Sequence, residues 1–170
     1  MKKLLVLALA SLICLQASAQ TVPQKCGYVN TETILSAIPE YKVATDKLEA
    51  LGKQYQNELQ AMQDEIQRKA DEYEKTKSTM NATKQQETET MLNDLMQKYQ
   101  QALQDNQAQF NKAQQEKMAP IQEKIYKAIE NVGKAGGYVY IMQTGTVPYI
   151  SDTLSKDVTA EVKAELNKMK

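Results

Sequence analysis

The sequence predicts an α+β protein in which a long antiparallel helical hairpin protrudes from a small β-rich body. The first observation behind this expectation is the segment 53–119, which contains neither Gly nor Pro and is rich in good helix formers. The second is apolar spacing of three and four residues on both sides of one short polar break. The third is a gathering of apolar and aromatic residues at 26–30 and 138–142, near the two chain ends.

Composition excludes several functional classes. The chain has 170 residues, with 21 basic and 21 acidic side chains, six Gly and no His. Without His it cannot build a Ser-His-Asp or Cys-His nucleophile system or most zinc sites, and its balanced charge argues against nucleic acid as a partner. The segment Gly133-Lys134-Ala135 lacks the upstream Gly and the Ser or Thr of a phosphate-binding loop. We therefore expect a protein that is not an enzyme and that has no cofactor or metal.

Residues 1–19 have the layout of a secretory signal peptide. Two lysines precede a long apolar run, and Ala17-Ser18-Ala19 supplies the small residues of a cleavage site after Ala19. A lipoprotein signal that uses Cys14 is the alternative, and bulky Ile13 disfavours it. Export then leaves Cys26 as the single cysteine, either buried in the body or paired between chains.

The body is expected from two separate segments, residues 20–38 and 133–170. Cys26 to Asn30 forms the first predicted strand, and Tyr138 to Met142 forms a second, buried one. Between the hairpin and this second strand, three glycines at 133, 136 and 137 suit a helix C-cap and a turn.

The last part of the chain adds two weaker expectations. Thr146 to Ser151 is a further candidate strand, which Pro148 demotes to a sheet edge. Asp157 is placed to cap a final helix. The apolar face expected for that helix consists of Val158, Val162, Leu166 and Met169.

Residues 39–132 are predicted to form the hairpin, with Pro39 at the start of the first arm and the reversal at 77–83, where Ser, Thr and Asn cluster. The first apolar stripe comprises Ala44, Leu48, Leu51, Tyr55, Leu59, Met62, Ile66, Ala70 and Tyr73. The second comprises Leu92, Leu95, Tyr99, Leu103, Asn106, Phe110, Gln114, Lys117, Ile121, Ile125, Ala128 and Val132. The second stripe repeats every eleven residues, and this period predicts arms that are nearly straight or slightly right-handed, not a left-handed coiled coil.

Two helix breakers lie near the base of the hairpin. Gly52 lowers local helix stability by about 1 kcal/mol, and Pro120 removes a backbone hydrogen bond. One interpretation is a pair of staggered hinges that let the arms splay. The other is that both residues are tolerated irregularities.

The body is too small to be stable alone while it anchors two long arms. Exposed strand edges can pair between subunits, so we expect oligomerisation through the sheet. The residues expected to form this oligomeric body are Cys26, Tyr28, Val29, Tyr138, Val139, Tyr140, Ile141 and Ile150.

A combination of short motifs resembles one protein family across nearly the whole mature chain. The motifs are Gly27-Tyr28-Val29-Asn30, Ile38-Pro39-Glu40-Tyr41, Ile121 to Val132, Gly136-Gly137-Tyr138-Val139, Tyr149, and Asp157 to Val162. In content and spacing they resemble the Skp (OmpH-like) periplasmic chaperones. The resemblance implies a homotrimer in the periplasm whose three hairpins surround a cavity. It also implies unfolded outer-membrane β-barrel proteins as partners, held without ATP.

Two groups of hairpin residues fit such a role. Flexible thioethers suit promiscuous apolar contact, which makes Met80, Met91, Met96 and Met118 candidates for client binding, although the same residues fit ordinary positions beside the stripe. Lys75, Lys77 and Lys84 lie near the tip and would attract acidic clients or allow weak contact with a membrane surface, or they are simply solvated. The alternative function is a structural coiled-coil spacer or adaptor of the cell envelope.

Overall fold

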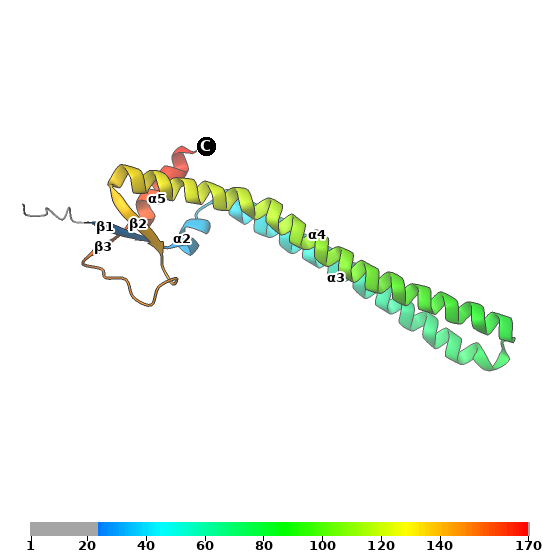
Figure 1. Cartoon of the computed structure of the whole chain (residues 1–170). Coiled ribbons are helices and arrows are strands. Elements are labelled where there is room, and N and C mark those ends of the chain that lie inside the picture. Colours follow the sequence, from blue (N-terminus) through cyan, green and yellow to red (C-terminus); the bar gives the residue numbers. More distant parts are fainter. Residues whose placement is uncertain (1–23, 170) are drawn as a thin grey trace, which may run out of the picture.

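The computed structural model describes residues 24–169 and shows a small body from which two long helices extend side by side (Figure 1). The elements in chain order are β1 (Lys25–Val29), α2 (Thr31–Leu35), α3 (Pro39–Thr76), the 3₁₀ turn η2 (Lys77–Thr79), α4 (Ala82–Gly136), β2 (Tyr138–Gln143), β3 (Ser155–Asp157) and α5 (Thr159–Lys168). The expected signal peptide and its cleavage after Ala19 lie outside the described residues. Within 24–169, no helix combines the length and the apolar character needed to cross a membrane.

The sheet has three strands in the order β2-β1-β3, and both pairings are parallel. Gly27 of β1 lies opposite Ile141 of β2 and opposite Lys156 of β3. Adjacent parallel strands need a long crossover between them, and here α3 and α4 supply it for β1 and β2. The hairpin is therefore an insertion between two neighbouring strands, which fixes both of its ends to the body.

The third strand lies later in the chain than the sequence suggests. Residues 146–151, expected as an edge strand, belong to the segment that connects β2 to β3, and Ser155–Asp157 pairs with β1 instead. Gly145, at φ 86°, turns the chain away directly after β2, so residues 146–151 do not continue along the sheet. The short polar sequence of β3 carries no strand pattern of its own, and only its pairing with β1 reveals it.

The two arms begin and end with recognisable caps. Pro39 occupies the first turn of α3, as expected. The chain reverses through η2, and the Asn81 side chain then accepts a hydrogen bond from the Lys84 backbone N–H at 2.9 Å. Helix α4 continues past Gly133 and ends at Gly136, with Gly137 as its left-handed C-cap at φ 65°.

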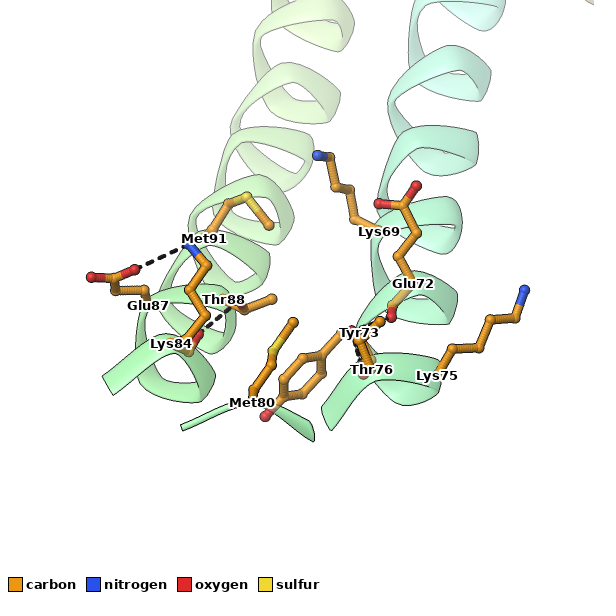
Figure 2. Close-up of a pocket in the computed structure, with 10 residues that line it drawn as sticks. All are labelled: Lys69, Glu72, Tyr73, Lys75, Thr76, Met80, Lys84, Glu87, Thr88 and Met91. Carbon is orange, nitrogen blue, oxygen red and sulfur yellow. Dashed lines mark hydrogen bonds and ion pairs between the residues drawn. The ribbon is translucent and has the colours of Figure 1, made fainter. Parts of the chain in front are cut away.

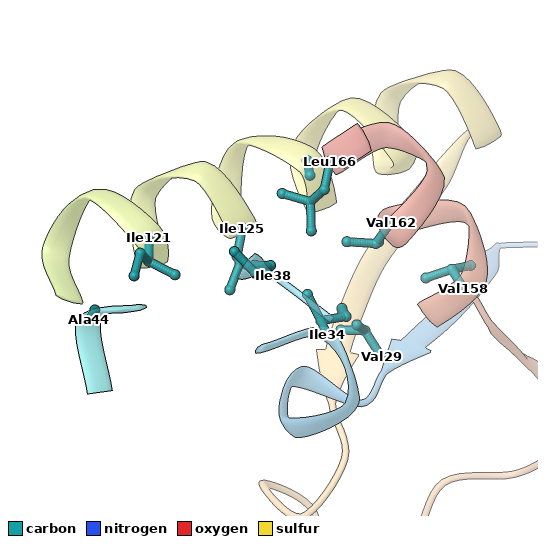
Figure 3. Packing of buried hydrophobic residues seen from close by; sticks show 10 residues of the cluster. Val29, Ile34, Ile38, Ala44, Ile121, Ile125, Val158, Val162 and Leu166 are labelled. Carbon is teal, nitrogen blue, oxygen red and sulfur yellow. The ribbon is translucent and has the colours of Figure 1, made fainter. Parts of the chain in front are cut away.

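The core of the body joins residues from both chain ends and from the base of the hairpin (Figure 3). Its members are Val29, Ile34, Ile38, Ala44, Ile121, Ile125, Ala128, Val158, Val162 and Leu166. Val158, Val162 and Leu166 are buried and Met169 packs against the cluster, so the expected apolar face of the last helix is confirmed. Asp157 lies just before α5 and accepts a hydrogen bond from the Thr159 backbone N–H at 2.8 Å.

A short helix that the sequence did not reveal completes this core. Helix α2 spans only five residues and is capped by Asn30, whose side chain accepts a hydrogen bond from the Thr33 N–H at 2.9 Å. It places Ile34, which is fully buried, beneath the sheet and α5.

The seam between α3 and α4 follows the predicted stripe in the first arm and departs from it in the second. Leu103 is 43% exposed, and Gln114 is exposed. Ala102, which precedes Leu103, and Ala113, which precedes Gln114, are half buried instead. The buried and half-buried positions from Tyr99 to Lys117 are 99, 102, 106, 110, 113 and 117. Their steps of 3-4-4-3-4 keep the expected eleven-residue period, with Ala102 and Ala113 in the places expected for Leu103 and Gln114.

Candidate functional site

The tip of the hairpin contains a cavity of about 480 Å³ between the last turns of α3 and the first turns of α4 (Figure 2). Met80 and Met91 face one another across it, and both are half buried. Met80 belongs to the reversal, where its extended backbone ends η2. The structure thus brings together two of the four methionines expected to contact clients.

A tyrosine closes one side of this cavity. Tyr73 is only 5% exposed, and its hydroxyl donates a hydrogen bond of 2.5 Å to the Glu89 carboxylate on the other arm. This bond stabilises the neutral phenol and raises the pKa of Tyr73 to about 12. The Lys77 ammonium group lies 5.1 Å from the centre of the ring, within range of a cation–π interaction. Of these contacts, the Tyr73–Glu89 bond holds the two arms together beside the reversal.

The other two candidate methionines lie elsewhere. Met96 is 51% exposed on α4, outside the seam. Met118 packs against the core of the body at the far end of the hairpin. The four residues therefore do not form one continuous surface on a single chain.

The expected hinge residues lie in uninterrupted helices and at different levels of the hairpin. A Cβ atom built on Gly52 would lie 3.5 Å from the Phe110 ring, so Gly52 stands opposite that ring in the seam. Pro120 lies inside α4, is exposed, and lines a groove together with Val43 and Ala44. Because Pro120 has no backbone N–H, the carbonyl group of Glu116 has no regular intrahelical hydrogen-bond donor.

This second depression, which we call the base groove, was not anticipated from the sequence. It has a volume of about 500 Å³ and lies where the arms meet the body. Its apolar lining consists of Ile38, Pro39, Val43, Ala44, Pro120 and Ile121. The one sequence signal was Val43, an apolar residue directly beside the predicted stripe and therefore not turned into the seam.

Charged residues surround the base groove. Lys124 donates a hydrogen bond of 2.9 Å to the Glu40 carboxylate, and this bond is the main reason that the pKa of Glu40 lies below its usual value. Lys47 and Lys117 also line the groove, and within residues 24–169 neither has a carboxylate within 4.0 Å. Lys117 is half buried at a seam position.

The middle of the hairpin seam is polar. Asn106 is buried, at 7% exposure, and its amide donates a hydrogen bond of 3.5 Å to the Glu58 carboxylate. One turn away, the Tyr55 hydroxyl donates to the Gln109 side chain at 3.2 Å. Polar pairs bring less stabilisation to a seam than apolar ones, so the two arms are joined more weakly here than at the base.

The residues expected to form the oligomeric body divide into two groups. Val29 is buried within the single chain, and Tyr138 and Ile141 pack against the same core. A Cβ atom on Gly136 would lie 2.3 Å from the Tyr138 ring, which shows how closely this ring covers the end of α4.

The second group is available to a partner. Val139 and Tyr140 of the edge strand β2 are 57% and 48% exposed, and Cys26 and Tyr28 of β1 are half buried. The Cys26 thiol beside the Tyr140 hydroxyl raises the pKa of that tyrosine. Ile150 is half buried in the segment between β2 and β3. Two further apolar side chains of that segment, Tyr149 and Leu154, are almost fully exposed, at 78% and 79%.

Taken together, these features define a class of protein with long arms and shallow apolar surfaces, carried by a small body with an uncovered sheet edge. Among residues 24–169, no group of three or more His, Cys, Asp or Glu side chains is placed to hold a metal ion. Surfaces of this kind suit binding of extended or irregular partners.

Comparison with known proteins gives the family. The sequence matches the family described as outer membrane protein (OmpH-like) over residues 25–166, and the chain belongs to this family. It is 26% identical over 138 residues to the chaperone protein Skp of Vibrio cholerae, a match that covers 79% of this chain and 80% of that protein. The fold is similar to the crystal structure of an OmpH-like protein from Caulobacter crescentus CB15, with a TM-score of 0.70 and 15% identity. That similarity covers 91% of this chain and 90% of the other. The family supports a role as a chaperone.

Proposed function

We propose that this chain is an ATP-independent holdase of the periplasm that binds unfolded outer-membrane β-barrel proteins between the hairpins of a homotrimer. The observation that carries the proposal is the hairpin itself, a pair of long arms with shallow apolar surfaces, in a chain of the OmpH-like family. A holdase must bind many sequences weakly and release them unaided, and several shallow contacts meet this need better than one deep pocket.

The body supports the assembly. Strand β2 is an edge strand, and its exposed Val139 and Tyr140 would otherwise present an unpaired, apolar edge to water. Pairing of this edge, together with the exposed Tyr149 and Leu154, would bury the largest apolar side chains that the body leaves uncovered. We expect three copies to join through these residues, with their hairpins on one side.

The proposed independence from ATP is supported by the structure of one segment. Gly133-Lys134-Ala135, the segment closest in composition to a phosphate-binding loop, lies within helix α4 and forms no loop. Client release must then rely on the weakness of the individual contacts.

The proposal is tested with the mature chain, residues 20–170. We expect it to sediment as a trimer and to keep a urea-denatured outer-membrane barrel soluble after dilution, with or without ATP. A monomer that leaves barrel aggregation unchanged would refute the proposal. A single tight partner, with no general protection of unfolded barrels, would instead favour the envelope spacer or adaptor.

A further inference from the structure

The base groove has an apolar floor that the single chain leaves open to solvent. Val43 is 52% exposed on the rim of this floor, although its neighbour Ala44 is buried in the core. Pro120 on the opposite helix is exposed as well. An exposed apolar floor between two helices, rimmed by charged residues, is typical of an interaction site.

The charges around this floor are unequal. Both carboxylates of the rim have a cation nearby: Glu40 pairs with Lys124 at 2.9 Å, and Glu116 lies 3.9 Å from Lys112. The two remaining lysines, Lys47 and Lys117, have no such partner within residues 24–169. Both lysines line the groove, so their ammonium groups are available to pair with an anionic group of a ligand. An apolar floor beside ammonium groups that have no carboxylate partner in the described part of the chain is what an extended peptide with apolar and acidic side chains requires.

We propose that the base groove binds an extended segment of an unfolded chain in which an apolar residue and an acidic residue stand two positions apart. In an extended chain, residues i and i+2 point to the same side, so the apolar side chain reaches the floor while the carboxylate reaches Lys117 or Lys47. The inference rests on the proposed function, because it names the kind of client sequence that the hairpin holds. It assigns to the base of the arms a selectivity that shallow apolar contact alone does not provide.

The test measures fluorescence anisotropy of labelled peptides with the mature chain at low salt. A peptide of Leu-Ser-Asp-Ser repeats is compared with one of Leu-Ser-Lys-Ser repeats. We expect the acidic peptide to bind at least about fivefold more tightly, because the unpaired lysines attract one and repel the other. Added salt should reduce this difference.

Matched substitutions locate the binding. Val43→Ser should weaken the acidic peptide about fivefold, whereas Leu103→Ser, at a similarly exposed position on α4 far from the groove, should change its affinity by less than about twofold. Lys117→Gln should reduce both the affinity for the acidic peptide and the dependence of that affinity on salt. Lys47→Gln should have the same two effects, and because Lys47 is exposed this substitution leaves the seam unchanged. Circular dichroism and sedimentation confirm that each variant keeps the wild-type fold and mass.

Several results would overturn the inference. Equal affinity for the two peptides would remove the charge selectivity, and equal losses in Val43→Ser and Leu103→Ser would remove the groove. Phosphatidylglycerol vesicles that bind wild type but not Val43→Ser, without peptide binding to either, would assign the groove to lipid. The barrel-aggregation assay is run in parallel: protection of barrels without peptide selectivity contradicts this inference alone, whereas loss of protection by wild type contradicts the proposed function.

Discussion

The Tyr73 hydroxyl at the end of α3 donates a 2.5 Å hydrogen bond to the Glu89 carboxylate in the second turn of α4, and so joins the two arms beside the tip. Few other side-chain bonds cross the seam. Those described further along it are the Tyr55–Gln109 and Asn106–Glu58 pairs in the middle of the hairpin and the Lys124–Glu40 pair at its base. At the tip, the Gln85 side chain also donates hydrogen bonds to the backbone carbonyls of Lys77 and Met80, so the geometry of the tip cavity depends on Tyr73 together with Gln85.

Tyr73→Phe should loosen the tip while leaving the body intact. The substitution removes the hydrogen bond but keeps the ring, so the backbone amides of residues 82–92 should exchange hydrogen severalfold faster. Hydrogen exchange followed by mass spectrometry measures this change. Tyr99→Phe is the control, since the structure shows no hydrogen bond to the Tyr99 hydroxyl among residues 24–169. Unchanged exchange in Tyr73→Phe would contradict the role of the bond.

The same bond predicts a pH dependence. The pKa of Tyr73 is about 12 in the folded chain and near 10 in an unfolded one, so the neutral phenol is favoured by folding. Its contribution to stability is complete below pH 10 and is lost as the pH rises from about 10 to about 12. Absorbance of tyrosinate at alkaline pH should contain a component with a midpoint near 12 that Tyr73→Phe removes. Persistence of that component in the variant would assign it to another tyrosine.

Asn106→Leu should tighten the middle of the hairpin. Replacing a buried amide in the seam with an apolar side chain should stabilise the hairpin by about 1 kcal/mol, because Glu58 is exposed and regains water as its partner. Thermal unfolding followed by circular dichroism measures this gain. Gln107→Leu, at an exposed neighbouring position, controls for helix propensity. A melting temperature that falls only in Asn106→Leu would mean that the Asn106–Glu58 pair stabilises the seam more than packing does.

Two glycines of the long helices should respond to alanine in opposite ways. At Gly52 the new Cβ would meet the Phe110 ring at an ordinary 3.5 Å, so Gly52→Ala should stabilise α3 by about 1 kcal/mol. At Gly136 the new Cβ would lie 2.3 Å from the Tyr138 ring, which would have to leave its place against the core. Gly136→Ala should therefore lower the melting temperature. Equal shifts in the two variants would contradict this reading of their surroundings.

The double variant Gly52→Ala, Pro120→Ala tests the hinge hypothesis. Alanine at 120 restores the backbone donor to the Glu116 carbonyl, and both changes favour straight, regular helices. We expect stiffer arms that protect a narrower size range of unfolded barrels, measured by aggregation assays with one small and one large barrel. Each single variant shows which position is responsible. Equal protection of both barrels by wild type and the double variant would refute a hinge at these positions.

Much of the architecture could be predicted from the sequence because its signals are local. The Pro39 start, the capping Asn81 and the regular stripe of α3 follow from side-chain types and spacing alone. Side-chain types and spacing did not predict in the same way which residues of α4 face the seam. Leu103 and Ala102 are both acceptable in a helix, and only the position of α3 decides that the smaller residue faces it.

The remaining features depend on contacts between distant segments. Strand β3 is three polar residues, and its pairing with β1 is a matter of topology rather than of propensity. The five-residue helix α2 is too short for a periodic pattern. The base groove combines Val43 with Pro120 across two arms, so a reading along one segment does not reveal it. The tip cavity was only partly anticipated, through Met80 and Met91.

The insertion of both arms between β1 and β2 has a consequence for the order of folding. Lys25, at the start of β1, donates a hydrogen bond to the carbonyl of Gly136, a residue 111 positions later. Such a distant closure is slow for a flexible chain, but zippering of α3 against α4 brings the two ends together. The sheet should therefore form last, after the whole hairpin has been made. In the trimer that we propose, a chain whose second arm is still incomplete lacks the β2 edge expected to recruit further copies, so association before the chain is finished is avoided by topology alone.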